Sequence, residues 1–142
     1  MSTQAPAAHL TAPIWNWDVY YKLAIETAKA TPKDFIKTVG NYYGGLKENF
    51  VEISPLSNNC SKNSAEYIEA VRALIKSGEW DVFSGVKLSF DANGAIVKTN
   101  ADLKDNAGNV VVAAGGASVA DGVIQGSMNY YVEGVVQHNN NG

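Results

Sequence analysis

The order of predicted elements indicates an α/β fold: strand, helix, strand and helix, followed by several short β elements. Two observations support this prediction. Apolar residues at helical spacing follow each of two short strand-like runs, and D-x-x-G hairpin turns occur only after Gly78. Because strands joined by a crossover helix pair in parallel, we expect a parallel α/β core with a C-terminal β-hairpin appendix.

Length and composition fit a protein with one ordinary hydrophobic core. The chain has 142 residues, of which 46% are hydrophobic and 18% charged, and its formal net charge is −3. We expect residues 1–8 to be a flexible lead-in, residues 9–136 to form one α/β domain, and residues 137–142 to be a disordered tail. The weak negative charge argues against a nucleic-acid partner.

The run of residues 9–21 organises the predicted fold. It reads as a short strand that stops at two tryptophans and turns into a helix with Asp18 as N-cap. In extended backbone, alternate side chains share a face, which places Trp15 and Trp17 together and Asn16 opposite. Strand ends that lead into helices are where open α/β sheets bind ligands. These three residues are therefore the candidate site for a flat, polar molecule, and burial of both indoles in a core is the alternative.

The first helix and the second strand follow in order. Helical spacing continues after Asp18 until Thr31-Pro32, because the residue before proline disfavours helical backbone. Residues 33–49 are less regular and contain an aromatic Gly-Gly turn. Residues 50–56 read as a second strand that ends near a proline. Pro13 lacks an N–H, which predicts either an edge position for the first strand or a strand whose pairing ends there.

The second helix has the clearest local signals. Asn63 and Glu66 form a capping-box pattern ahead of its apolar residues, and Gly78 is the expected C-terminal glycine. Beyond it, residues 91–97 and 105–111 share a pattern in which glycine supplies the positive φ of a hairpin turn. We interpret this pattern as a small duplication. A single helical turn within 119–128 and a last strand-like segment at 130–136 complete the prediction.

The residues do not assemble a catalytic set. Walker, dinucleotide-binding, zinc-protease and nucleophile-elbow motifs are absent from the sequence. His9 and His138 lie near the ends, and the acidic residues are dispersed. Cys60 is the single cysteine, so an intrachain disulfide and a cysteine-based metal site are excluded. We therefore expect a non-enzymatic protein with no cofactor and no metal site.

Four stretches together resemble the C-terminal part of the basic membrane protein family, the purine-nucleoside-receptor-like solute-binding proteins of ABC importers. Those stretches are residues 8–17 with 20–21, 43–46 with 51–56, 77–85, and 128–135. Each stretch alone is weakly specific, but the occurrence of all four in the same order as in the family is more specific. The resemblance extends over nearly the whole chain, from about residue 8 to residue 136, and over only the last part of a family member.

This resemblance implies a partial type I periplasmic-binding-protein fold, in which two α/β lobes close on a ligand at a hinge. It implies the solute-binding component of an ABC importer, or a fragment of one, that binds a nucleobase- or nucleoside-like molecule. The partners would be a missing N-terminal lobe and the membrane permease, and the location would be periplasmic or extracellular. The first residues lack the features of a signal peptide. Exposed lobe surface also predicts a homo-oligomer.

Trp15 departs from the family pattern. In the nucleoside receptors a ligand-contacting lysine follows a similar Leu-Thr-Ser stretch, and Trp15 stands at the matching position here. An aromatic face in place of a cation favours a flat, less hydroxylated ligand such as a nucleobase. The alternative is a non-catalytic, oligomerising interaction module of the same fold without a ligand site. Solvent-exposed indoles at Trp15 and Trp17 would favour binding, whereas buried ones would favour a scaffold. Residues 86–113 exceed the expected hairpin and are predicted to decorate the surface.

Overall fold

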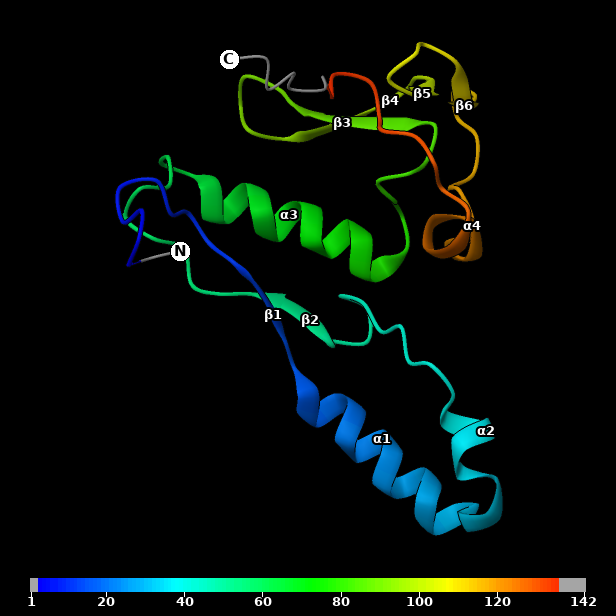
Figure 1. Cartoon of the computed structure of the whole chain (residues 1–142). Helices are drawn as coiled ribbons and strands as arrows, with labels where there is room; N and C mark the ends of the chain where they lie inside the picture. Colours follow the sequence, from blue (N-terminus) through cyan, green and yellow to red (C-terminus); the bar gives the residue numbers. More distant parts are fainter. Residues whose placement is uncertain (1–2, 136–142) are drawn as a thin grey trace, which may run out of the picture. The chain divides into compact units, whose positions relative to one another are not determined.

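A computed structural model describes residues 3–135 of the chain (Figure 1). The fold is mixed α/β with small antiparallel sheets. One domain was expected over residues 9–136, and the chain divides into two compact units, Met1–Ser77 and Gly78–Gly142. In the predicted lead-in, residues 3–8 form turns. The predicted tail at residues 137–142 lies outside the described residues.

The first unit combines one small sheet with three α-helices and a short 3₁₀ helix. Its elements in chain order are β1 (Pro13–Trp15), α1 (Trp17–Ala30), η1 (Pro32–Asp34), α2 (Phe35–Val39), β2 (Val51–Ile53) and α3 (Ser64–Ser77). Both η1 and α2 lie in the stretch that the sequence predicted to be irregular, because neither has enough turns to produce a readable apolar period.

Helix α1 begins two residues earlier than predicted. Asn16 occupies the N-cap position, Trp17 is already helical, and Asp18 lies in the first turn, where its charge suits the helix dipole. The predicted end is confirmed. Thr31 is the C-cap, its N–H donates to Thr27 O at 2.8 Å, and Pro32 starts the next element.

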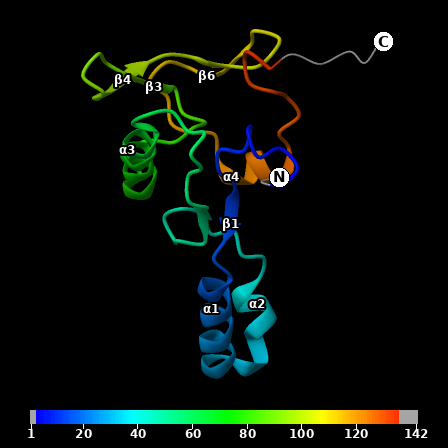
Figure 2. The same cartoon turned by 90° about the vertical axis from the view of Figure 1, so that its left-hand side faces the viewer.

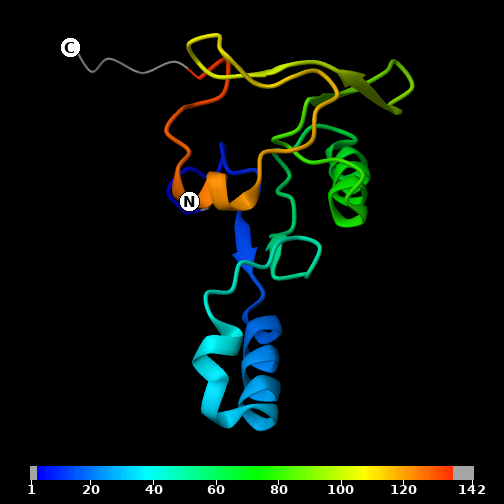
Figure 3. The same ribbon diagram turned by 90° about the vertical axis from the view of Figure 1, so that its right-hand side faces the viewer.

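The β1–β2 sheet corrects the predicted parallel core. Pro13 pairs with Ile53 and Trp15 with Val51 in antiparallel register. The reason is that α1 and α2 form a helical hairpin, in which α2 returns alongside α1 (Figures 2 and 3). A hairpin brings the chain back to the end of the strand it left, whereas one crossover helix would carry it to the strand's beginning.

The edge position of Pro13 is confirmed by the ladder of β1. Asn16 N–H donates to Phe50 O, and Ala12 O accepts from Ser54 N–H, each at 2.8 Å. The backbone N–H and C=O groups of the even-numbered residues of this strand therefore point toward β2. The backbone nitrogen of Pro13, which has no hydrogen to donate, points toward the outer edge of the sheet. Two residues before β1, the side chain of Thr11 adds a further contact, in which its Oγ1 donates to Ser54 O at 2.7 Å.

The limits of helix α3 are those that the sequence predicts. It starts at Ser64, directly after Asn63, and stops at Ser77, before Gly78. The φ of Gly78 is +74°, the left-handed conformation that ends many helices.

The second unit consists of two hairpins and a short helix. Its elements are β3 (Val86–Phe90), β4 (Ile96–Asn100), β5 (Leu103–Lys104), β6 (Val110–Val112) and α4 (Asp121–Gly126). Pairing is antiparallel within β3–β4 and within β5–β6. Helix α4 matches the predicted helical turn. In the described part of 130–136 an isolated bridge from Val132 to Asp105 replaces the expected strand.

The two hairpin turns share one geometry, as their shared sequence pattern predicts. Asp91 Oδ1 accepts from the N–H groups two and four residues later, at 2.8 and 2.9 Å. Asp105 Oδ1 does the same at 2.9 and 2.8 Å. Gly94 and Gly108 have φ values of +81° and +88°. Both hairpins are therefore closed by one device, a carboxylate that accepts two backbone donors ahead of a left-handed glycine.

Candidate functional site

The two candidate indoles are exposed and adjacent. Trp15 is 57% exposed and Trp17 is 50% exposed. Their ring centroids lie 6.3 Å apart with planes tilted by 39°. The sequence analysis favours ligand binding if these two indoles are exposed and a scaffold if they are buried, and they are exposed. The alternation rule does not explain their proximity, however, because Trp15 ends a strand while Trp17 opens a helix.

Phe50 is what brings the two indoles together. Its ring centroid lies 5.3 Å from that of Trp15 and 5.5 Å from that of Trp17. At 5% exposure it is the one buried apolar side chain among residues 3–135. Tyr42 packs on it edge-on at 5.0 Å. We call the assembly the aromatic cluster; its members are Trp15, Trp17, Tyr20, Tyr21, Tyr42 and Phe50.

The loop before β2 delivers Phe50 to this cluster. Phe50 N–H donates to Gly45 O at 3.0 Å, and Glu48 Oε2 accepts from Gly45 N–H at 2.8 Å. That backbone donor holds the pKa of Glu48 below its ordinary value. Gly44 is required by close packing, because a Cβ there would lie 2.6 Å from the Tyr42 hydroxyl. Sequence reasoning missed the role of Phe50, which was read only as the start of a strand.

The geometry decides how a flat ligand can approach. A ring held between two indoles needs parallel planes roughly 7 Å apart, twice a stacking distance of about 3.5 Å. The Trp15–Trp17 pair is too close and too tilted for that. Trp17 also stacks on Tyr21 at 6.2 Å with planes 27° apart. Of the two indoles, Trp15 therefore has the freer face, because its ring neighbours are Trp17 and Phe50 alone, whereas Trp17 has four.

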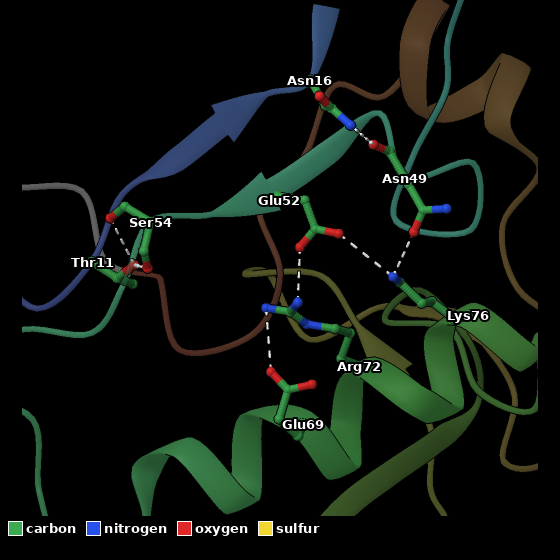
Figure 4. Close-up of polar contacts among 8 residues, drawn as sticks. All are labelled: Thr11, Asn16, Asn49, Glu52, Ser54, Glu69, Arg72 and Lys76. Carbon is green, nitrogen blue, oxygen red and sulfur yellow. Dashed lines mark hydrogen bonds and ion pairs between the residues drawn. The ribbon is translucent and has the colours of Figure 1, made fainter. Parts of the chain in front are cut away.

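Asn16 lies between the indoles in sequence and is directed elsewhere in space. Its Nδ2 donates to Asn49 O at 3.1 Å (Figure 4). It makes no side-chain cap bond to α1. The structure thus brings Trp15 and Trp17 together and uses the amide of Asn16 to attach the β1–α1 junction to the loop before β2.

A polar network continues from that loop to α3 (Figure 4). Lys76 Nζ donates to Asn49 Oδ1 at 2.7 Å and lies 3.5 Å from Glu52 Oε1. Arg72 Nη1 pairs with Glu52 Oε2 at 2.8 Å, and Arg72 Nη2 lies 3.5 Å from Glu69. Glu52 is three-quarters buried, so its two cationic partners compensate for its desolvation. The sequence signals for this network were the carboxylate of Glu52 between apolar strand residues and the two cations Arg72 and Lys76, which lie four residues apart on α3.

Two cavities lie apart from the aromatic cluster. One of about 280 Å³ lies in the first unit, between the end of β2 and α3, with Ile53, Leu56 and Ile68 in its lining. One of about 360 Å³ lies in the second unit, where Trp80 fixes its indole by donating to Val86 O at 2.7 Å. Trp15, Asn16 and Trp17 line neither cavity.

Within residues 3–135, His, Cys, Asp and Glu side chains nowhere gather in groups of three or more that could hold a metal ion. None of the described helices is both long and apolar enough to cross a bilayer. No protein-family model matches the sequence, and a search of curated proteins gives no match.

Proposed function

We propose that the chain binds a flat heteroaromatic solute of the nucleobase class on the exposed surface of Trp15 and Trp17. One observation carries the proposal: two half-exposed indoles lie side by side at a strand-to-helix junction, supported from below by the buried ring of Phe50. Exposed aromatic surface held in one orientation gains free energy when a planar ligand displaces its water, with little loss of side-chain entropy.

The outer face of Trp15 is the proposed stacking surface. Stacking of a base on an aromatic side chain contributes about 1–3 kcal/mol, which gives weak binding from one face alone. Closure of a second surface over the ligand would add contacts and exclude water. In this proposal Asn16 positions the junction through Asn49 rather than contacting the solute.

The proposal extends to the role of the protein as the solute-binding component, or a fragment of one, of an ABC importer. Residues of the first unit would form part of one ligand-binding lobe, and another segment or chain would supply the second lobe. Its support is the exposure of large apolar side chains beside Phe50, the one buried apolar side chain in the described part of the chain. The permease partner and the periplasmic or extracellular location depend on the sequence resemblance alone.

Indole fluorescence tests the proposal. The Trp80→Phe variant leaves Trp15 and Trp17 as the reporters, since the chain has three tryptophans. Adenine, guanine, cytosine and uracil, with their nucleosides, are the ligands. We expect saturable quenching by at least one base and loss of that response in Trp15→Ala. The matched control is Tyr43→Ala, which removes a ring that is 68% exposed and outside the aromatic cluster, and it should bind normally.

Two results would overturn the proposal: no response to any base or nucleoside, or an equal response when Trp15 is alanine. The second candidate function is an oligomerising interaction module without a ligand site. It is favoured by the apolar surface that continues from Trp17 along α1, where Tyr21 and Ile25 are 58% and 56% exposed. Concentration-dependent association combined with a silent titration would support this second function.

A further inference from the structure

Helix α1 carries an exposed apolar stripe. Trp17, Tyr21 and Ile25 recur every fourth residue and therefore share one face of the helix. Each is at least half exposed. Ala28 continues the same face by one further turn and is also exposed. Large apolar side chains in a continuous exposed row are typical of a protein–protein contact.

The side of α1 that adjoins the stripe away from these exposed residues is already used. Tyr20, Ala24 and Thr27 are only partly exposed, and α2 packs alongside this helix (Figure 2). The Tyr20 ring contacts Tyr42, at a centroid distance of 5.8 Å. The helix is therefore apolar over more of its circumference than α2 covers, and the stripe is the part left exposed.

A row of charges borders the stripe on one side. Asp18, Lys22, Glu26 and Lys29 follow each other at intervals of four, four and three residues, and all four are exposed. None of them takes part in an ion pair of the described chain. The signs alternate along the helix. In the opposite chain direction the order of signs is reversed, so a second copy of the row that runs antiparallel to the first places an opposite charge against each residue.

We propose that α1 binds α1 of a second copy of this chain, antiparallel and across a twofold axis. In that register Asp18 lies opposite the partner's Lys29, and Lys22 lies opposite the partner's Glu26. Large side chains then meet smaller ones, since Trp17 faces the partner's Ala28 and Tyr21 faces the partner's Ile25. The contact is isologous, so each of these interactions occurs twice. Two parallel copies would instead place like charges at the same height.

The size of the surface sets the expected strength. One face of a single helix is smaller than a standard protein interface, which predicts a reversible dimer in the micromolar range. The paired stretch begins at Trp17, so Trp15 in β1 lies outside it. Trp17 belongs to both proposed surfaces, whereas Lys22 and Glu26 lie outside the aromatic cluster, so charge exchanges at these two positions separate dimerisation from the proposed nucleobase binding.

Sedimentation equilibrium of the whole chain, from low micromolar to millimolar concentration, tests the inference. We expect a monomer–dimer equilibrium in the unmodified chain. Tyr21→Lys should raise the dissociation constant at least tenfold, because it buries a charge in the stripe. Lys22→Glu and Glu26→Lys should each raise it about threefold to tenfold, because each places like charges opposite each other twice. Combining both exchanges restores opposite signs and should recover the original constant.

Lys47→Glu is the matched control, because it makes the same change of net charge as Lys22→Glu at an exposed loop position. It should leave the dissociation constant unchanged. A monomer at every concentration would overturn the inference, as would a double exchange that associates as weakly as either single variant. A weakened dimer in Glu26→Lys with an unchanged nucleobase response is the expected combination, which separates this inference from the proposed function.

Discussion

The aromatic cluster of the first unit and the hairpin turns of the second unit are stabilised by contacts of different range. In the first unit, residues far apart in the chain meet: Phe50 supports Trp15 and Trp17, and Glu52 pairs with Arg72. In the second unit, hairpin turns close within five residues through their own aspartates. The difference teaches that the surface proposed to bind ligand depends on long-range packing, whereas the hairpins depend on local turn chemistry.

The largest expected effect comes from removing the support of the aromatic cluster. Phe50→Ala should lower the unfolding free energy of the first unit by about 3 kcal/mol, because it deletes a buried ring and leaves a cavity. Urea denaturation followed by indole fluorescence in Trp80→Phe protein measures this change. Phe90→Ala, which removes a ring that is 38% exposed from the second unit, is the control. Equal shifts of the transition in the two variants would contradict the comparison.

The polar network of the first unit is expected to contribute less. Glu52→Ala should cost about 1–2 kcal/mol of unfolding free energy, because Arg72 and Lys76 lose a charge-assisted partner. Glu69→Ala removes a carboxylate that is 65% exposed and 3.5 Å from the same arginine, so it should cost less than about 0.5 kcal/mol. Chemical denaturation of both variants measures the difference, and similar losses would show that burial of Glu52 is unimportant.

What could be predicted from the sequence follows the same division. The limits of α3, the end of α1 and the two aspartate–glycine turns depend on residues within a few positions of each other, and all were predicted correctly. The antiparallel pairing of β1 and β2 was not, because it depends on α2, a helix of five residues without a readable period. A parallel core was therefore the wrong inference from a correct order of elements.

The candidate site shows the limit most clearly. Trp15 and Trp17 were predicted to share a face, and they do lie together, but through Phe50 rather than through strand alternation. The contact of Asn16 with Asn49 and the bonds of Glu52 to α3 join residues at least 20 positions apart. Local patterns cannot specify which distant partner a polar side chain finds.

A smaller effect is expected in the second unit. Gly108→Ala should destabilise the β5–β6 hairpin by about 1 kcal/mol, because the φ of +88° disfavours any side chain. No atom lies within 4 Å of a Cβ built there, so the cost comes from the backbone alone. Gly122→Ala in α4 is equally unobstructed and should be neutral or stabilising. Amide hydrogen exchange of the two segments compares them, and equal protection would contradict the turn argument.

The smallest expected effect is a pH dependence of that hairpin turn. The side-chain amide of Asn109, followed by backbone N–H donors, holds the pKa of the Asp105 carboxyl below its ordinary value. A lowered folded-state pKa means that the turn is fully stabilised at neutral pH and loses this contribution as pH falls through the lowered value. Asn109→Ala should raise the pKa of Asp105 toward its ordinary value, as measured by NMR titration. An unchanged titration would exclude Asn109 as the cause.

The most direct test of the ligand surface is an NMR titration of the three indole N–H resonances with a nucleobase. Trp15 and Trp17 lie in the aromatic cluster, whereas Trp80 belongs to the second unit and lines its cavity. We predict saturable shifts of the Trp15 and Trp17 resonances and no shift of the Trp80 resonance. Movement of the Trp80 resonance alone, or of none of the three, would contradict the assignment of ligand binding to this strand-to-helix junction.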